Sequence, residues 1–134
     1  MKYSTRLSDA VHILVLISEN KDGTLSSSDI ATSVYTNPSY VRQLMSRLRN
    51  SGIISSVRGL ATPTLIKEAS HITLLDIYSA VEPELFVIEC MNPKKSCIRN
   101  LDAEGCRVHR ELHRIQDVLM RELSSRTIGE IMEQ

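Results

Sequence analysis

Three cysteines and one histidine form the densest group of redox-active and metal-binding side chains in this 134-residue chain. Six residues separate Cys90 from Cys97, eight separate Cys97 from Cys106, and two separate Cys106 from His109. The last pair has i, i+3 spacing near the start of an expected helix, so both side chains could reach one ligand. The residues by themselves leave three interpretations open: a metal site, zinc included although the spacing is not that of a zinc finger; a thiol switch through a Cys97–Cys106 or intersubunit disulfide; or cysteines that only pack.

A second group of side chains has the chemistry of nucleic-acid recognition. Asn37-Pro38 predicts a helix start, a capping side chain followed by proline at the first helical position, for a helix over residues 38–50. Apolar residues at i, i+3, i+4 and i+7 predict its inner face. Arginine can bond guanine, glutamine can bond adenine, and serine and tyrosine can reach phosphate. The predicted inner face holds Val41, Leu44, Met45 and Leu48, and the predicted DNA-binding face holds Ser39, Tyr40, Arg42, Gln43, Ser46, Arg47 and Arg49.

Charge along the chain supports this hypothesis, although the total is neutral. Sixteen Lys and Arg balance sixteen Asp and Glu, yet residues 1–67 carry a net charge of +4 and the remainder −4. Residues 38–67 contain five positive charges and no acid. The alternative is an ordinary solvated helix face, but such faces usually mix both signs. The pattern therefore favours DNA as the partner.

Two short β-branched stretches, residues 53–57 and 64–67, predict a β-hairpin after this helix. Its loop carries Arg58 and Gly59, and we expect Arg58 to enter a minor groove or meet phosphate while Gly59 permits the turn. Lys67 could add a phosphate contact. The alternative for Arg58 is an exposed turn residue without a partner.

The order of the expected elements is that of a winged helix-turn-helix: helices over residues 6–19, 27–34 and 38–50, the hairpin, then helices over 74–82, 102–125 and 128–132. The predicted fold class is mainly α with a small β-hairpin. We expect a DNA-binding domain over residues 1–82, a cysteine-containing loop over 83–100, and a dimerisation helix with a C-terminal tail over 101–134. The predicted dimerisation stripe, whose alternative is packing within the chain, comprises Val108, Leu112, Ile115, Leu119 and Leu123.

Other classes of protein fit the sequence poorly. The longest apolar run, residues 13–17, is too short to span a bilayer, and no secretory signal pattern is visible. Three cysteines without such a signal predict a cytoplasmic protein. No glycine-rich phosphate loop, GxSxG elbow or zinc-protease histidine pair indicates an enzyme. A winged-helix module that binds other proteins, with structural cysteines, remains the alternative to a DNA-binding regulator.

Six segments along the chain form a recognisable set of motifs. They are residues 8–14 (SDAVHIL), 37–42 (NPSYVR), 48–56 continuing into 58–59, 72–77 (ITLLDI), 80–82 (AVE) and 127–131 (TIGEI). These segments resemble the Rrf-two family of bacterial winged-helix regulators, and the resemblance covers nearly the whole chain with the order of motifs intact. It implies a homodimeric transcription factor, usually a repressor, with the third helix in the major groove and the hairpin beside it.

The resemblance also bears on the cysteines and on the hairpin. Iron–sulfur members of the family carry three cysteines in this region, and a Cys-x-x-His spacing occurs among them, so the resemblance implies a [2Fe–2S] cluster on Cys90, Cys97, Cys106 and His109. A redox or nitrosative signal received by thiols alone stays the alternative. Family hairpins commonly continue Arg-Gly with Gly-Gly-Tyr, whereas this chain has residues 60–63 (LATP). We therefore expect a shorter, stiffer loop and carry over no hairpin contact beyond Arg58 and Gly59.

Overall fold

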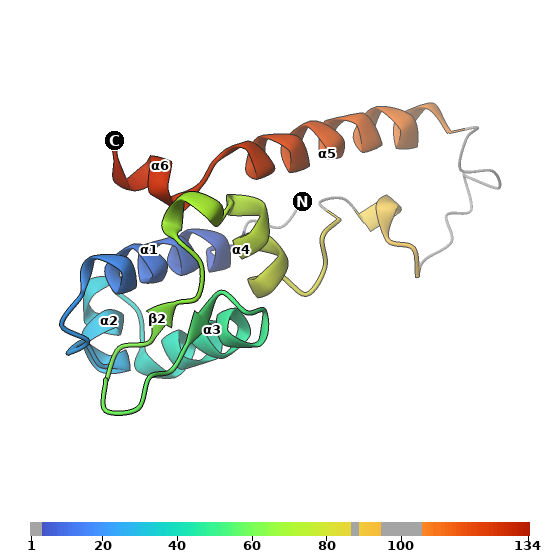
Figure 1. Ribbon diagram of the computed structural model, residues 1–134. Helices are drawn as coiled ribbons and strands as arrows, with labels where there is room; N and C mark the ends of the chain where they lie inside the picture. The colour runs from blue at the N-terminus through green and yellow to red at the C-terminus, as the bar shows by residue number, and fades with distance from the viewer. Residues whose placement is uncertain (1–3, 87–88, 95–105) are drawn as a thin grey trace.

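The computed structural model describes residues 4–86, 89–94 and 106–134, and its elements follow the order of a winged helix-turn-helix (Figure 1). Three helices come first, then a two-stranded hairpin and a fourth helix, and a long helix precedes the C-terminal turn. The elements are α1 (Arg6–Glu19), α2 (Ser27–Ser33), α3 (Pro38–Asn50), β1 (Ile54–Ser55), β2 (Thr64–Leu65), the 3-10 turn η1 (Ala69–His71), α4 (Leu74–Val81), the 3-10 turn η2 (Glu89–Met91), α5 (Arg107–Ser125) and α6 (Ile128–Met132).

Local capping explains where most helices begin. The Ser26 side chain accepts from the backbone N–H of Asp29, whose carboxylate accepts from Ser26 in return. Reciprocal caps of the same kind open α4 and α6. At α3 the Asn37 Oδ1 atom accepts from the Tyr40 N–H over 2.8 Å, and Pro38 follows at the first helical position. The predicted bounds of the first and third helices agree with the structure.

One hydrophobic core joins α1, α3 and α4. Because Trp is absent and Phe occurs once, aliphatic side chains fill it. Burying these apolar surfaces is the main stabilising term of the fold, at roughly 25 cal/mol per Å². The fully buried large aliphatic side chains are Ile13, Leu14, Ile30, Val41, Leu44, Leu48, Ile54, Ile72, Ile77, Val81 and Ile128.

The C-terminal tail packs into this core. Ile128 is 0% exposed, and its N–H donates to the Ile72 carbonyl over 2.9 Å. The Leu74 N–H donates to the Arg126 carbonyl over 2.9 Å, and Thr73 forms an isolated antiparallel bridge with Thr127. The chain therefore leaves the winged body after α4 and returns to it at α6.

The long helix α5 projects away from the body in Figure 1 (orange), and only its C-terminal part approaches α4. None of its residues is buried. The predicted start at residue 102 lies outside the described residues, and Cys106 is the N-cap rather than a helical residue. Among the helices that the structure describes, none combines the length and apolar character needed to cross a membrane.

Candidate nucleic-acid interface

The helix α3 separates an apolar inner face from a polar outer face, as its spacing predicts. Val41, Leu44, Met45 and Leu48 are buried. This burial fixes the rotation of the helix, so most of the residues between them face outward. The helix contains no carboxylate. Five of the seven predicted DNA-binding residues on it are exposed: Ser39, Arg42, Gln43, Ser46 and Arg49.

The sixth residue, Tyr40, is half-buried and already bonded within the protein. Its hydroxyl donates to Asp9 Oδ2 of α1 over 3.2 Å. Burial raises the pKa of the Tyr40 phenol, so the group stays a neutral hydrogen-bond donor. The Tyr40 side chain therefore ties the first turn of α3 to α1.

The seventh residue, Arg47, is also half-buried, and its guanidinium serves the fold. Its Nη1 atom donates to the backbone carbonyl of Val81, the last residue of α4, over 2.9 Å. A helix leaves its final carbonyls without partners inside the helix, and an arginine satisfies one of them here. Helical spacing assigns Arg47 to the outer face, but it could not show that α4 ends within its reach.

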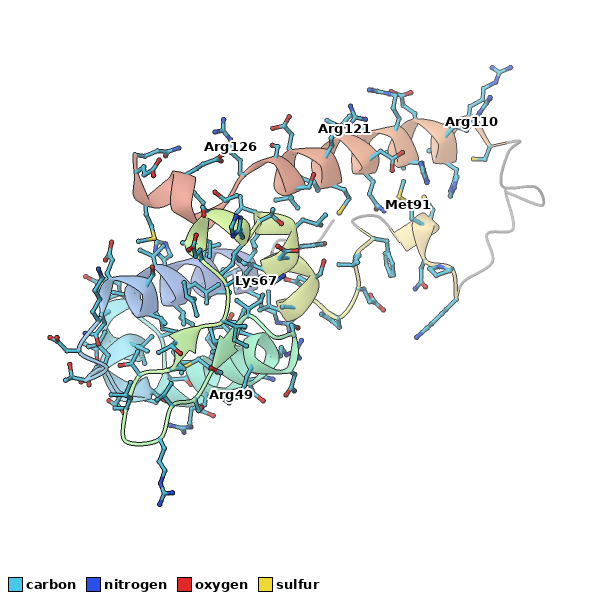
Figure 2. The ribbon with its side chains drawn as sticks, in the orientation of Figure 1. Arg49, Lys67, Met91, Arg110, Arg121 and Arg126 are labelled. Carbon is cyan, nitrogen blue, oxygen red and sulfur yellow. The ribbon has the colours of Figure 1, made fainter. Side chains whose placement is uncertain are left out.

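The hairpin lies beside α3 and extends from the same side of the body (Figure 1). Ile54 pairs with Leu65 and Ser55 with Thr64, so the strands are shorter than predicted. Arg58 is exposed in the connecting loop, and Gly59 follows it with a φ of +89°. Figure 2 shows Arg49 on the α3 side, whereas Arg110 and Arg121 lie far away along α5.

Residues that sequence reasoning missed fix the second half of this loop. The Gly23 carbonyl, in the α1–α2 turn, accepts from the N–H groups of Ala61 (2.9 Å) and Thr62 (3.2 Å). Thr62 is 1% exposed and donates its hydroxyl to the Leu25 carbonyl over 2.7 Å. The only hint of these contacts in the sequence was that residues 60–63 replace the glycines that are common in family hairpins. In the structure, these replacements belong to a hairpin loop that is hydrogen-bonded to the α1–α2 turn.

The structure brings two of the four predicted sulfur and histidine ligands together. Cys106 caps α5, and its Sγ atom accepts from the His109 N–H at 3.4 Å. His109 Nδ1 is buried and, among the described residues, has no hydrogen-bond partner. Cys90 is half-buried in η2, and Cys97 lies outside the described residues. No three His, Cys, Asp or Glu side chains within residues 4–86, 89–94 and 106–134 form a metal-binding group. The described residues alone therefore do not assemble a cluster site.

Comparison with known proteins settles which family shares this arrangement. The family model described as Rrf2, iron-dependent transcriptional regulator, matches residues 3–134. The chain belongs to the Rrf2 family. Its curated relatives are transcriptional regulators rather than enzymes.

Three similar Rrf2-family proteins illustrate the relationship. YwnA of Bacillus subtilis (strain 168), whose name describes an HTH-type transcriptional regulator, is 34% identical over 131 residues, covering 96% of each chain. The HTH-type transcriptional regulator IscR of Escherichia coli (strain K12 / DH10B) is 30% identical over 134 residues, covering 98% of this chain and 80% of IscR. The structure of CymR (YrzC), the global cysteine regulator of B. subtilis, superposes with a TM-score of 0.72 at 26% identity, covering 100% and 98% of the two chains. The winged fold and the family are thus established together.

Proposed function

We propose that this Rrf2-family regulator binds double-stranded DNA as a homodimer, acts as a repressor, and responds to a redox, iron–sulfur or nitrosative signal through its cysteine region. The observation that carries the DNA-binding part is the outer face of α3. Its exposed groups are two arginines, a glutamine and two serines, with no acid between residues 38 and 67. Arg58 extends this surface onto the hairpin.

Each group on that face has a role in binding a duplex. A B-DNA major groove admits one α-helix, and bidentate arginine–guanine and glutamine–adenine pairs supply sequence discrimination there. Arg42 and Gln43 precede Arg49 on the helix, and the serines at 39 and 46 can donate to phosphates. Tyr40 and Arg47 connect the helix to α1 and α4 through their hydrogen bonds to Asp9 and Val81. In this proposal Arg58 meets the neighbouring backbone or minor groove.

The test removes two exposed arginines at once. A duplex is selected from a random pool with the wild-type protein, and its affinity is measured for Arg42→Ala/Arg49→Ala. We expect at least a tenfold loss, because each good bidentate contact contributes about 1–3 kcal/mol. The control, Arg110→Ala/Arg121→Ala, removes equal charge from exposed positions on α5 and should bind within about twofold of wild type.

Two outcomes would contradict the DNA-binding proposal. In the first, the wild-type protein enriches no duplex from the pool. In the second, both double variants bind equally well, which would assign the outer face of α3 to another partner, as expected for a protein–protein module. Arg58→Ala provides a further check, because the loss of one phosphate contact lowers the slope of log affinity against log salt by about 0.9.

A homodimer is supported by the apolar surface of α5. Val108, Ile115 and Leu119 of the predicted dimerisation stripe, together with the adjacent Val118, are between 38% and 64% exposed. Leu112 and Leu123 are half-buried. The helix is about 28 Å long at 1.5 Å per residue, enough to pair with a second copy along its length. A dimer would present two α3 helices to two half-sites.

The signal is assigned to Cys90, Cys97, Cys106 and His109. A [2Fe–2S] cluster on these residues would supply one-electron redox chemistry and sensitivity to oxidants; thiols alone would supply reversible oxidation. Support for a ligand comes from the buried His109 Nδ1 atom, one turn from Cys106, which has no hydrogen-bond partner within the part of the chain that the structure describes. Anaerobically purified protein should show visible absorption with stoichiometric iron and sulfide. A protein that is colourless in repeated preparations and reacts with thiol reagents would select the thiol mechanism. If every cysteine variant still responds to the signal as the wild-type protein does, both mechanisms are excluded.

A further inference from the structure

The turn between α2 and α3 holds an aromatic residue in a conformation that normally selects glycine. Tyr35 has a φ of +57°, and no other non-glycine residue in the described part of the chain has a positive φ. The Thr36 N–H donates to the Ala31 carbonyl over 2.9 Å, and the Tyr35 N–H lies 3.4 Å from the Thr32 carbonyl. This bonding pattern is a Schellman motif, in which Tyr35 occupies the left-handed position after the helix.

The end of α3 shows what the chain does at an equivalent position. Ile53 donates to the Leu48 carbonyl and Gly52 to the Arg49 carbonyl, each over 3.0 Å, and Gly52 has a φ of +78°. The same motif therefore ends two consecutive helices, once with glycine and once with tyrosine. Because a Cβ atom makes the left-handed conformation costly, tyrosine is the less stable choice at this position.

No packing of the Tyr35 side chain compensates for the strain in its backbone. The Tyr35 side chain is 97% exposed, the largest exposure among the exposed large hydrophobic residues. A buried tyrosine stabilises the fold by removing apolar surface from water and by forming a hydrogen bond. The Tyr35 side chain is exposed and buries almost no apolar surface. A strained residue that is fully exposed points to a role in binding rather than in folding.

The place of Tyr35 identifies the partner. It lies two residues before Asn37, the N-cap of α3, and four before the exposed Ser39. The α2–α3 turn therefore leads directly into the first turn of α3, the helix whose outer face we assign to the major groove. We propose that Tyr35 is an additional DNA-contacting residue, whose phenol hydroxyl donates to a phosphate at the edge of the groove that α3 enters. This inference rests on the proposed DNA-binding function.

The strain makes the test selective. Replacing Tyr35 by glycine should leave the midpoint of thermal unfolding equal to or above that of wild type, because the left-handed residue loses its strain. The same variant should bind the selected duplex about tenfold more weakly, the effect expected for one hydrogen bond to a charged group. Stability and affinity then move in opposite directions, which a purely structural residue cannot produce. Tyr35→Phe, which lacks only the hydroxyl, should lose affinity to a similar extent.

Controls separate this inference from the proposed function. Leu85→Ala, which shortens another exposed side chain (44%), should bind like wild type. If wild type binds and Arg42→Ala/Arg49→Ala does not, but both Tyr35 variants keep wild-type affinity, the Tyr35 contact is wrong and DNA binding stands. If Tyr35→Phe binds like wild type while Tyr35→Gly is weakened, the hydroxyl–phosphate bond is wrong. If wild type binds no duplex, both proposals fail.

Discussion

Arg47 of α3 donates a 2.9 Å hydrogen bond to the carbonyl of Val81, the last residue of α4. The next residue, Glu82, pairs with Arg6 of α1 at 3.4 Å. The C-terminal end of α4, from which the chain continues toward the cysteine region, is therefore hydrogen-bonded to α3, the proposed DNA-binding helix. This arginine, which helical spacing places on the predicted DNA-binding face, connects α3 with α4.

This contact predicts that Arg47 contributes to stability. Arg47→Met keeps most of the aliphatic stem but leaves the Val81 carbonyl without its donor. We expect a loss of about 1–3 kcal/mol in the free energy of unfolding, measured by urea denaturation. Arg42→Met, at an exposed position of the same helix, should change stability by less than about 0.5 kcal/mol. Equal stabilities for the two variants would show that the Arg47–Val81 bond contributes nothing measurable.

The approach of the hairpin loop to the α1–α2 turn predicts different costs at two glycines. Gly23 has a φ of +67°, and a Cβ atom there would lie 2.8 Å from Leu60 Cδ2. Gly59 has a φ of +89°, but a Cβ atom there would meet nothing within 4 Å. Both alanine variants suffer backbone strain, and Gly23→Ala should lose about 0.5–1.5 kcal/mol more because the end of the Leu60 side chain, which is 42% exposed, must leave its preferred rotamer.

The double variant Gly23→Ala/Leu60→Ala checks this explanation. Removing the leucine side chain should recover much of the additional loss, since the clash is with the end of that side chain. Equal melting temperatures for Gly23→Ala and Gly59→Ala would mean that the loop moves aside without cost.

The return of the chain at α6 predicts that the last residues stabilise the winged body. Ile128→Ala should lower the free energy of unfolding by about 2–5 kcal/mol, the usual cost of truncating a buried isoleucine. Ile66→Ala removes the same atoms from a 55% exposed side chain and should cost less than about 0.5 kcal/mol. If Ile128→Ala and Ile66→Ala have the same melting temperature, the C-terminal tail does not unfold together with the winged domain.

The exposed apolar face of α5 predicts a dimer that should dissociate when charged side chains are introduced on that face. Ile115→Glu/Leu119→Glu places two carboxylates on that face, where burial of unpaired charge is costly. Light scattering should show a dimer for wild type and a monomer for this variant. Arg121→Glu, on an exposed position outside the predicted stripe, should remain dimeric. A wild-type monomer at micromolar concentration would remove the dimer from the proposal.

Local signals in the amino-acid sequence determine much of this protein by themselves. Asn37, Pro38 and Gly52 mark both ends of α3 because capping involves only neighbouring residues. Apolar periodicity predicts which face of that helix is buried. The acid-free stretch from residue 38 to 67 predicts the chemistry of the opposite face. Order along the chain is enough for the winged arrangement, since each element carries its own pattern.

Contacts between residues far apart in the sequence were decided only by the tertiary structure. Whether Arg47 faces DNA or Val81 depends on where α4 ends in space, 34 positions later. The hydrogen bonds that residues 61 and 62 donate to the Gly23 carbonyl, and that Ile128 donates to the Ile72 carbonyl, also depend on how the elements pack. Periodicity reports which side of a helix avoids water, but it contains no distance to a group on another element. For that reason periodicity predicts which face of α3 is buried, while the partners of Tyr40 and Arg47 are visible only in the fold.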